Sequence, residues 1–145
     1  MVNKIKDKKL NLLFVCRYNR FRSRVAEAYF KKINKNKNIR AKSAGLIKGS
    51  PLNLSTVKIA KKFGLDIKGK TQGLSSKLMV WQNITVIVAN DVPKSVFNRN
   101  IKYGKKVIKF SIRDVSYENE KEIKKTIDKI IKKIDKLNKQ LEAKQ

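Results

Sequence analysis

The stretch LNLLFVCRYNRFRSR, residues 10–24, decides the fold of this chain. It opens with a largely apolar run, Leu10–Val15, of the kind that forms a strand buried on both faces of a sheet. A short loop follows, and beyond it the apolar residues recur at the spacing of a helix face: Ala26, Tyr29, Phe30 and Ile33. We therefore predict a strand, a tight loop and a helix over about residues 23–34, with Ser23 as its N-cap.

The loop between this strand and helix holds the residue types of a nucleophilic site. Cys16, the one cysteine among the 145 residues, follows the strand directly. The dipole of the following helix and the guanidinium of Arg22 both favour the ionised thiolate, which is the nucleophilic form of cysteine. Successive N–H groups of such a loop can surround an anion, and an arginine presents a planar fork that matches two phosphate oxygens. These features predict phosphoryl transfer through a cysteinyl-phosphate.

The order Cys-x5-Arg-Ser, with Asn19 inside it, resembles the low-molecular-weight protein tyrosine phosphatase family, whose loop commonly reads C-x-G-N-x-C-R-S. Two further segments resemble the family: Ala26-Glu27-Ala28 matches its AEA, and Ser43-Ala44-Gly45 matches its SAG. More matches follow in the same order: Gly49, Pro51, Ala60 and Gly64-Leu65-Asp66. Tyr18 stands where the family loop commonly has glycine, and Phe21 stands in place of its second cysteine.

The rest of the chain alternates strand-like runs with helical patterns. Strands are expected at 39–43, 84–89 and 107–110, and helices from Asn53 to Gly64, at 76–81, from Pro93, and at 123–141. Asn53 can cap its helix, and the last helix has a sustained apolar face. This order predicts a single α/β domain over residues 1–145, with a four-stranded parallel sheet and helices on both faces.

Polar residues lie where these strands end, and ligands of such sheets bind beside the carboxyl ends of the strands. We expect Cys16, Ser43, Asp91 and Asp114 to meet in one crevice. Ser43 and Asp91 are assigned structural support, Asp91 as the cap of the helix that starts at Pro93. Asp114 opens a loop after the last strand and is the general-acid candidate. The resemblance implies the same role, since the family has an aspartate in a D-P pair after that strand, although valine replaces the proline here.

Other residues of the loop have expected roles in binding. The resemblance implies that Cys16 attacks phosphorus while Arg22 and the loop amides bind the remaining phosphate oxygens. Ser23 is a candidate hydrogen-bond donor to the thiolate, and Asn19, which tolerates left-handed backbone, is expected to hold the loop shape. The remaining residues expected at the substrate site are Arg17, Tyr18, Arg20, Phe21 and Tyr117. The two arginines place positive charge at the rim, which favours strongly anionic substrates.

The composition is extremely basic, with 37 Lys and Arg against 11 Asp and Glu and a net charge of +26. One interpretation is lysine enrichment spread over solvated faces; the alternative is a nucleic-acid-binding module. The chain has no histidine, so a histidine ligand or base is excluded, and we expect no metal and no cofactor. No apolar stretch is long enough for a membrane helix, so we expect no membrane insertion and a cytoplasmic location.

A second motif offers a competing function. Gly64–Thr71 matches G-x4-G-K-[ST], the phosphate-binding loop of nucleotide triphosphatases. That loop must follow a strand and open a helix, whereas residues 57–63 have helical spacing. Nucleotide binding through this segment is therefore the weaker alternative.

The expected partners follow from the predicted chemistry. They are a phosphorylated protein or a small aryl phosphate as substrate, and phosphate or another oxyanion as inhibitor. Thiol-coupled arsenate reductases also resemble the family, but that chemistry needs further cysteines to resolve the arsenic adduct, and this sequence has one.

Overall fold

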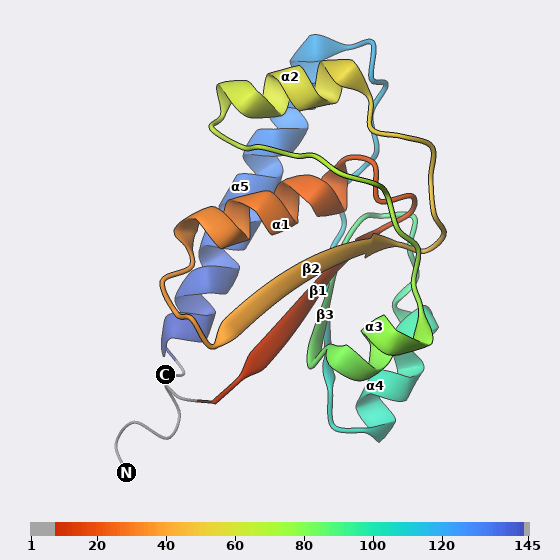
Figure 1. The fold of residues 1–145 in the computed structure, drawn as a ribbon, viewed down its shortest axis with the longest axis vertical. Coiled ribbons are helices and arrows are strands. Elements are labelled where there is room, and N and C mark those ends of the chain that lie inside the picture. The colour runs from red at the N-terminus through yellow and green to blue at the C-terminus, as the bar shows by residue number, and fades with distance from the viewer. Residues whose placement is uncertain (1–7, 144–145) are drawn as a thin grey trace.

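A computed structural model describes residues 8–143 and contains a sheet of four parallel strands (Figure 1). The strands are β1 (Leu10–Cys16), β2 (Ile39–Gly45), β3 (Ile84–Val88) and β4 (Lys106–Phe110), in the spatial order β2-β1-β3-β4. β1 is central and pairs in parallel with both β2 and β3. The predicted α/β fold with a four-stranded parallel sheet is confirmed.

Helices cover both faces of the sheet, as predicted (Figure 1). On one face lie α1 (Arg22–Ile33), α2 (Leu54–Lys62) and α5 (Glu120–Ala143). On the other lie α3 (Ser76–Trp81), the 3-10 helix η1 (Lys94–Phe97) and α4 (Asn98–Lys102). The central strands of a sheet covered on both faces are apolar on both sides, which accounts for the buried runs in β1 and β3.

Alternating residues of β1 belong to two separate cores. Leu12 and Phe14 belong to the larger cluster, which includes the apolar face of α5, while Leu13 and Val15 belong to the smaller cluster with Phe97. The buried apolar residues of α5 recur at helical spacing: Ile123, Ile127, Ile130, Ile134, Leu137 and Leu141. The two cores hold the sheet rigidly, and therefore hold the strand ends in place.

The helix caps differ in part from those predicted. Asn53 caps α2 as expected, since its Oδ1 accepts from the N–H groups of Ser55 and Thr56. The N-cap assigned to Ser23 is wrong: α1 begins at Arg22, and the cap position is Phe21, which has no side-chain cap bond. The helix starts earlier because the Phe21 carbonyl already accepts from the N–H of Val25. Ser23 therefore lies inside the first turn.

The nucleotide-binding interpretation of Gly64–Thr71 is also wrong. This segment follows helix α2 rather than a strand, and the residues after it are not helical until Ser76. Thr71 donates its hydroxyl to the carbonyl of Gly49, so this side chain packs against another loop. No helix within residues 8–143 is long and apolar enough to cross a membrane.

Candidate active site

Cys16 is the last residue of β1, and the loop 17–21 connects it to α1. The carbonyl oxygens of residues 16, 17 and 18 accept hydrogen bonds of 2.9–3.1 Å from backbone N–H groups in the segment 46–49. The peptide bonds are trans, so the C=O and N–H of each peptide unit point in opposite directions. The N–H groups of residues 17–19 therefore point away from the segment 46–49 and can face a bound anion. This backbone has the arrangement of an anion cradle.

Two glycines allow the segment after β2 to approach the loop this closely. A Cβ on Gly45 would lie 2.6 Å from the carbonyl carbon of Tyr18 and 2.8 Å from the nitrogen of Asn19. A Cβ on Gly49 would lie 2.6 Å from the Tyr18 carbonyl oxygen. Contacts this short do not occur with real side chains, so a larger residue at either position would displace the loop.

The sulfur of Cys16 is buried at the base of this loop, next to a hydroxyl. Its Sγ lies 3.0 Å from Ser23 Oγ, and the residue is 2% exposed. Asn19 Nδ2 donates to Ser23 Oγ at 2.9 Å. Because the asparagine supplies the donor of that bond, the Ser23 hydroxyl proton is left for the Cys16 sulfur. Ser23 is therefore placed to donate a hydrogen bond to the Cys16 sulfur.

A wider hydrogen-bond network fixes the loop from below. Asn19 has a left-handed backbone (φ 59°), Nδ2 of its side chain also donates to Ser43 Oγ, and Oδ1 accepts from the N–H of Gln72. Gln72 Nε2 donates to the Ser43 carbonyl. The Ser43 hydroxyl in turn donates to Glu27 Oε1 at 2.5 Å, and Glu27 pairs with Lys31. Ser43 is thus placed to support the loop.

Arg22 lies between the loops that follow β3 and β4. The residue is 2% exposed; its Nη1 donates to the Ile112 carbonyl at 2.9 Å and lies 3.1 Å from Asp91 Oδ1. Its Nη2 lies 3.8 Å from Asp114 Oδ2. The structure therefore brings Asp91 and Asp114 together around one guanidinium, beside the loop that carries Cys16.

The helix cap predicted for Asp91 is wrong. The cap position of η1 is Pro93, and no side chain caps that helix. Asp91 instead pairs with Arg22 at 3.1 Å and with Arg17 Nη1 at 3.9 Å. A carboxylate near a buried guanidinium gains more from charge pairing than from a helix terminus, which accounts for the difference. A support role for Asp91 stays a prediction, and its contact with Arg22 is the route by which it would act.

Asp114 is more exposed than Asp91, with 43% of its side chain accessible against 31%. Its Oδ1 accepts from the N–H of Val115 and its Oδ2 faces Arg22. Tyr117 lies nearby, and burial together with the charge of Asp114 raises the pKa of Tyr117 to about 12. Its hydroxyl therefore stays protonated at neutral pH.

The remaining predicted residues form the rim and wall of the loop. Arg17 Nε donates to the hydroxyl of Tyr18, and its guanidinium lies 5.4 Å from the centre of that ring. Arg20 Nε donates to the Pro51 carbonyl. Phe21 is buried and packs edge-on against a second aromatic ring, that of Tyr117, at 5.9 Å.

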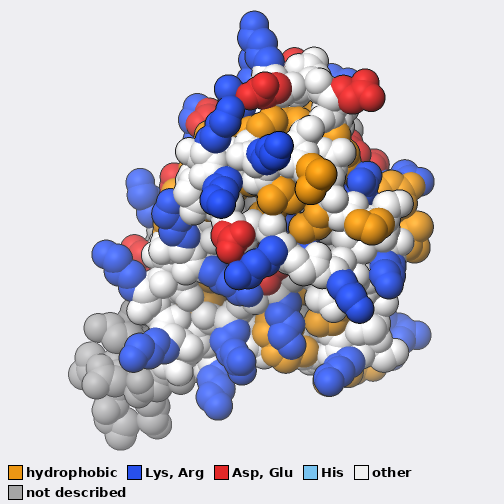
Figure 2. Space-filling view, turned by 45° about the horizontal axis from the view of Figure 1, so that its top comes forward, with side chains coloured by type: hydrophobic (Ala, Val, Ile, Leu, Met, Phe, Trp, Pro, Cys, Tyr) orange, Lys and Arg blue, Asp and Glu red, His pale blue; other side chains and the backbone are white. Residues whose placement is uncertain are grey.

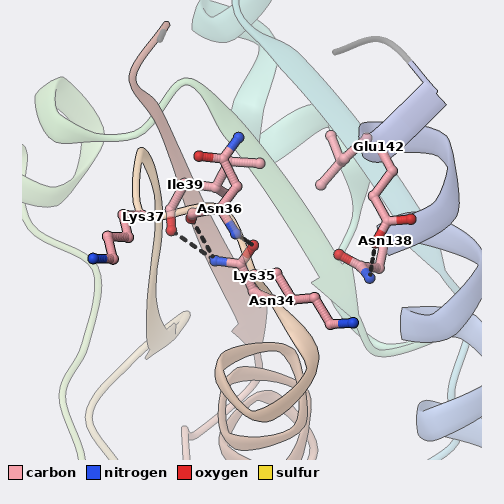
Figure 3. Close-up of a pocket in the computed structure, with 8 residues that line it drawn as sticks. Asn34, Lys35, Asn36, Lys37, Ile39, Asn138 and Glu142 are labelled. Atoms are coloured by element: carbon pink, nitrogen blue, oxygen red, sulfur yellow. Dashed lines mark hydrogen bonds between the residues drawn. The ribbon is translucent and has the colours of Figure 1, made fainter. Parts of the chain in front are cut away.

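A hollow of about 510 Å³ lies elsewhere, between the connection from α1 to β2 and the end of α5 (Figure 3). Asn34 bridges the backbone on one side of it, donating to the carbonyls of Asn36 and Ile39, and Asn138 donates to Glu142 on the other. Ile39 begins β2 and pairs with Leu10, so it lies at the opposite end of the strands from Cys16. This hollow contains no residue of the predicted site.

The sequence did not predict three parts of the site: Glu27, Gln72 and the carbonyl of Ile112. For Glu27 the only sequence signal is that Ala26-Glu27-Ala28 resembles the family's AEA, and that resemblance predicts no contact for its side chain. Gln72 and Ile112 had none, because their roles depend on loops that approach from positions distant in the chain.

Comparison with known proteins identifies the class. The profile of the family described as low molecular weight phosphotyrosine protein phosphatase matches residues 11–145. The chain belongs to this family. It is a cysteine-dependent phosphatase, a hydrolase of phosphomonoesters that works through a cysteinyl-phosphate intermediate.

No curated protein matches the chain, but solved structures do. A low molecular weight protein tyrosine phosphatase from T. tengcongensis is 25% identical, with a TM-score of 0.78, covering 91% of this chain and 99% of that one. The YwlE arginine phosphatase from Geobacillus stearothermophilus is 20% identical, with a TM-score of 0.80 and coverage of 94% and 95%. An arsenate reductase from Archaeoglobus fulgidus is 23% identical, with a TM-score of 0.69 and coverage of 88% and 98%.

Proposed function

We propose that this phosphatase hydrolyses phosphotyrosine in proteins and small aryl phosphates, with Cys16 as nucleophile, Arg22 as phosphate clamp and Asp114 as general acid. One observation carries the proposal: Cys16 Sγ lies 3.0 Å from Ser23 Oγ at the base of a loop whose carbonyl groups are bonded to the segment 46–49, which leaves its N–H groups on the other side. A cysteine sulfur next to a hydrogen-bond donor, beneath a loop that can bind an anion, is the arrangement that in-line attack on a bound phosphate requires.

The first step transfers the phosphoryl group to sulfur. The Cys16 thiolate attacks phosphorus, the S–P bond forms and the P–O bond to the phenol breaks. Asp114, protonated, gives its proton to the departing oxygen. Arg22 and the loop amides bind the three equatorial oxygens, where the charge of the transition state is spread.

The second step releases phosphate. Asp114, now a carboxylate, accepts a proton from water as the water oxygen attacks phosphorus. The S–P bond breaks and its electron pair returns to Cys16 as a thiolate, to which the Ser23 hydroxyl donates. Phosphate leaves, so phosphate and similar oxyanions should compete with substrate.

The rim favours aryl phosphates over the substrate of the arginine phosphatases that share the fold. Arg17 and Arg20 place two guanidinium groups beside the loop. A phosphoarginine would bring a third guanidinium into this positive field, which costs electrostatic energy. Arsenate reduction coupled to thiols is not favoured either, because one cysteine cannot form an intramolecular disulfide.

The free thiol of Cys16 bears on the compartment in which the chain acts. A site that depends on one free thiolate needs a reducing compartment, which supports the cytoplasm as the place of action.

On the face shown in Figure 2, lysine and arginine side chains are scattered among other residues rather than gathered into one patch. Non-specific nucleic-acid binding stays a prediction from net charge alone.

The test is release of phosphate from para-nitrophenyl phosphate and from a phosphotyrosine peptide, in chelator, with vanadate as competitor. The wild-type chain should turn over both and be inhibited by vanadate. Cys16→Ser should keep the circular dichroism spectrum and the binding of phosphate but lose turnover, because serine offers no accessible anion at neutral pH. Turnover by Cys16→Ser at a substantial fraction of the wild-type rate would exclude a cysteinyl-phosphate.

A further inference from the structure

At the mouth of the phosphate loop, the guanidinium groups outnumber the carboxylates by one. Three guanidinium groups lie there, those of Arg17, Arg20 and Arg22, and two carboxylates, Asp91 and Asp114, lie within 4.0 Å of a guanidinium. Asp91 is shared between Arg17 and Arg22, and Asp114 lies near Arg22. Among residues 8–143, no carboxylate forms an ion pair with Arg20.

The side chain of Arg20 is held in place by neutral groups. Its Nε donates to the Pro51 carbonyl at 3.0 Å, and its guanidinium lies 5.0 Å from the centre of the Tyr117 ring. The Cγ of Arg20 also runs close to Gly49, where a Cβ would come within 3.0 Å. A long side chain fixed in this way loses little conformational entropy when it binds a ligand.

The bonds that fix Arg20 leave its terminal groups available for a ligand. The carbonyl of Pro51 takes Nε, and the ring takes one face of the guanidinium, but neither satisfies the two terminal NH₂ groups. Those groups form the edge of the fork that pairs with carboxylates. The reacting phosphate has its own clamp in Arg22, so Arg20 is not needed for that charge.

We propose that Arg20 is a specificity-determining residue that binds the carboxylate of an aspartate or glutamate next to the phosphotyrosine of a peptide substrate. The inference rests on the proposed function and adds the sequence context of the substrate. Arg20 binds a group outside the reacting phosphate, so its contribution depends on the peptide rather than on the leaving group.

The experiment compares three phosphotyrosine peptides that differ only beside the phosphotyrosine, with acidic, neutral amide or lysine neighbours. The quantity measured is the ratio of kcat/KM for the acidic peptide to that for the neutral one. Wild type should favour the acidic peptide by roughly two- to fivefold, the size of a partly exposed ion pair. Arg20→Ala and Arg20→Gln should bring this ratio close to one, and Arg20→Lys should restore part of it.

Arg40→Ala is the matched control, because it removes the same charge from an exposed position near the amino end of β2, remote from Cys16. It should keep the wild-type ratio. If Arg40→Ala lowers the ratio as much as Arg20→Ala does, bulk charge rather than Arg20 selects the substrate, and the proposal is overturned. A ratio near one in wild type also overturns it.

Failure of the proposed function gives a different result. In that case wild type hydrolyses neither the neutral phosphotyrosine peptide nor para-nitrophenyl phosphate. Arg20→Gln keeps an N–H donor for the Pro51 carbonyl without the charge, so it covers the event that Arg20→Ala unfolds. Thermal denaturation of each variant separates loss of selectivity from loss of structure.

Discussion

The guanidinium of Arg22 lies 3.1 Å from the carboxylate of Asp91, through Nη1 and Oδ1. This contact is an ion pair without hydrogen-bond geometry, since Asp91 Oδ1 has no hydrogen-bond partner within the described residues. Asp114, by contrast, approaches the same arginine at 3.8 Å and is more exposed. We therefore propose different tasks for the two carboxylates: Asp91 anchors Arg22, and Asp114 is available to reach the leaving group.

The first prediction separates these two tasks by substrate. A good leaving group departs without a proton, whereas a poor one needs a general acid. Asp114→Asn should therefore slow phenyl phosphate by about 10²–10⁴-fold and para-nitrophenyl phosphate far less. Asp91→Asn should slow both substrates by a similar factor and lower stability by about 1–3 kcal/mol, because Arg22 loses its closest counter-ion. A leaving-group dependence in Asp91→Asn and none in Asp114→Asn would reverse the two roles.

The second prediction concerns Arg22 and the binding of anions. Phosphate should raise the melting temperature of the wild-type chain, by the equivalent of about 2.7 kcal/mol at a hundredfold excess over its Kd. Arg22→Ala should remove this effect, whereas Arg40→Ala should keep it. Nucleic-acid binding, if driven by net charge, should fall steeply with salt and be the same in both variants. Tight nucleic-acid binding without any aryl phosphatase activity would replace the proposed function.

The sequence could predict the sheet and the position of the nucleophile because both depend on short-range patterns. The apolar run before Cys16 and the helical spacing after it define a strand, loop and helix locally, and a parallel sheet then brings the strand ends together. The sequence could not predict the partner of Asp91, because that contact depends on how the loops after β3 and β4 approach Arg22. The bond from the Gln72 N–H to Asn19 joins residues 53 positions apart, and no local pattern encodes such a contact.

The third prediction is a loss of stability at alkaline pH. Tyr29 and Tyr117 both have a pKa raised from 10.0 to about 12, in each case chiefly by burial and then by a neighbouring carboxylate, Asp135 or Asp114. Between pH 10 and 12 the unfolded chain loses these two protons before the folded chain does. The free energy of unfolding should therefore fall as pH rises through this window.

Tyr29→Phe and Tyr117→Phe should each remove one part of this alkaline loss. Ultraviolet titration should show one late-ionising tyrosine fewer in each variant, and denaturant unfolding across the window should show a flatter dependence on pH. An unchanged slope in both variants would mean that other groups cause the loss.

The last prediction follows from Cys16 being the one cysteine of the chain. Peroxide oxidises a thiolate to a sulfenic acid, which a second thiol can rescue as a disulfide. Phe21 occupies the position where the family loop commonly has a second cysteine, so no neighbouring thiol of this chain can form that disulfide. We therefore expect oxidation of Cys16 to proceed readily to the sulfinic and sulfonic acids. A dithiol added after prolonged peroxide should then fail to restore activity, and mass spectrometry should find these acids at Cys16.

Phe21→Cys supplies the missing thiol and should make inactivation largely reversible, at a cost of about 3 kcal/mol in stability because the buried ring is lost. Circular dichroism checks that the variant folds. Full reactivation of the wild-type chain by dithiol would show that external thiols reach the buried Cys16 before it oxidises further.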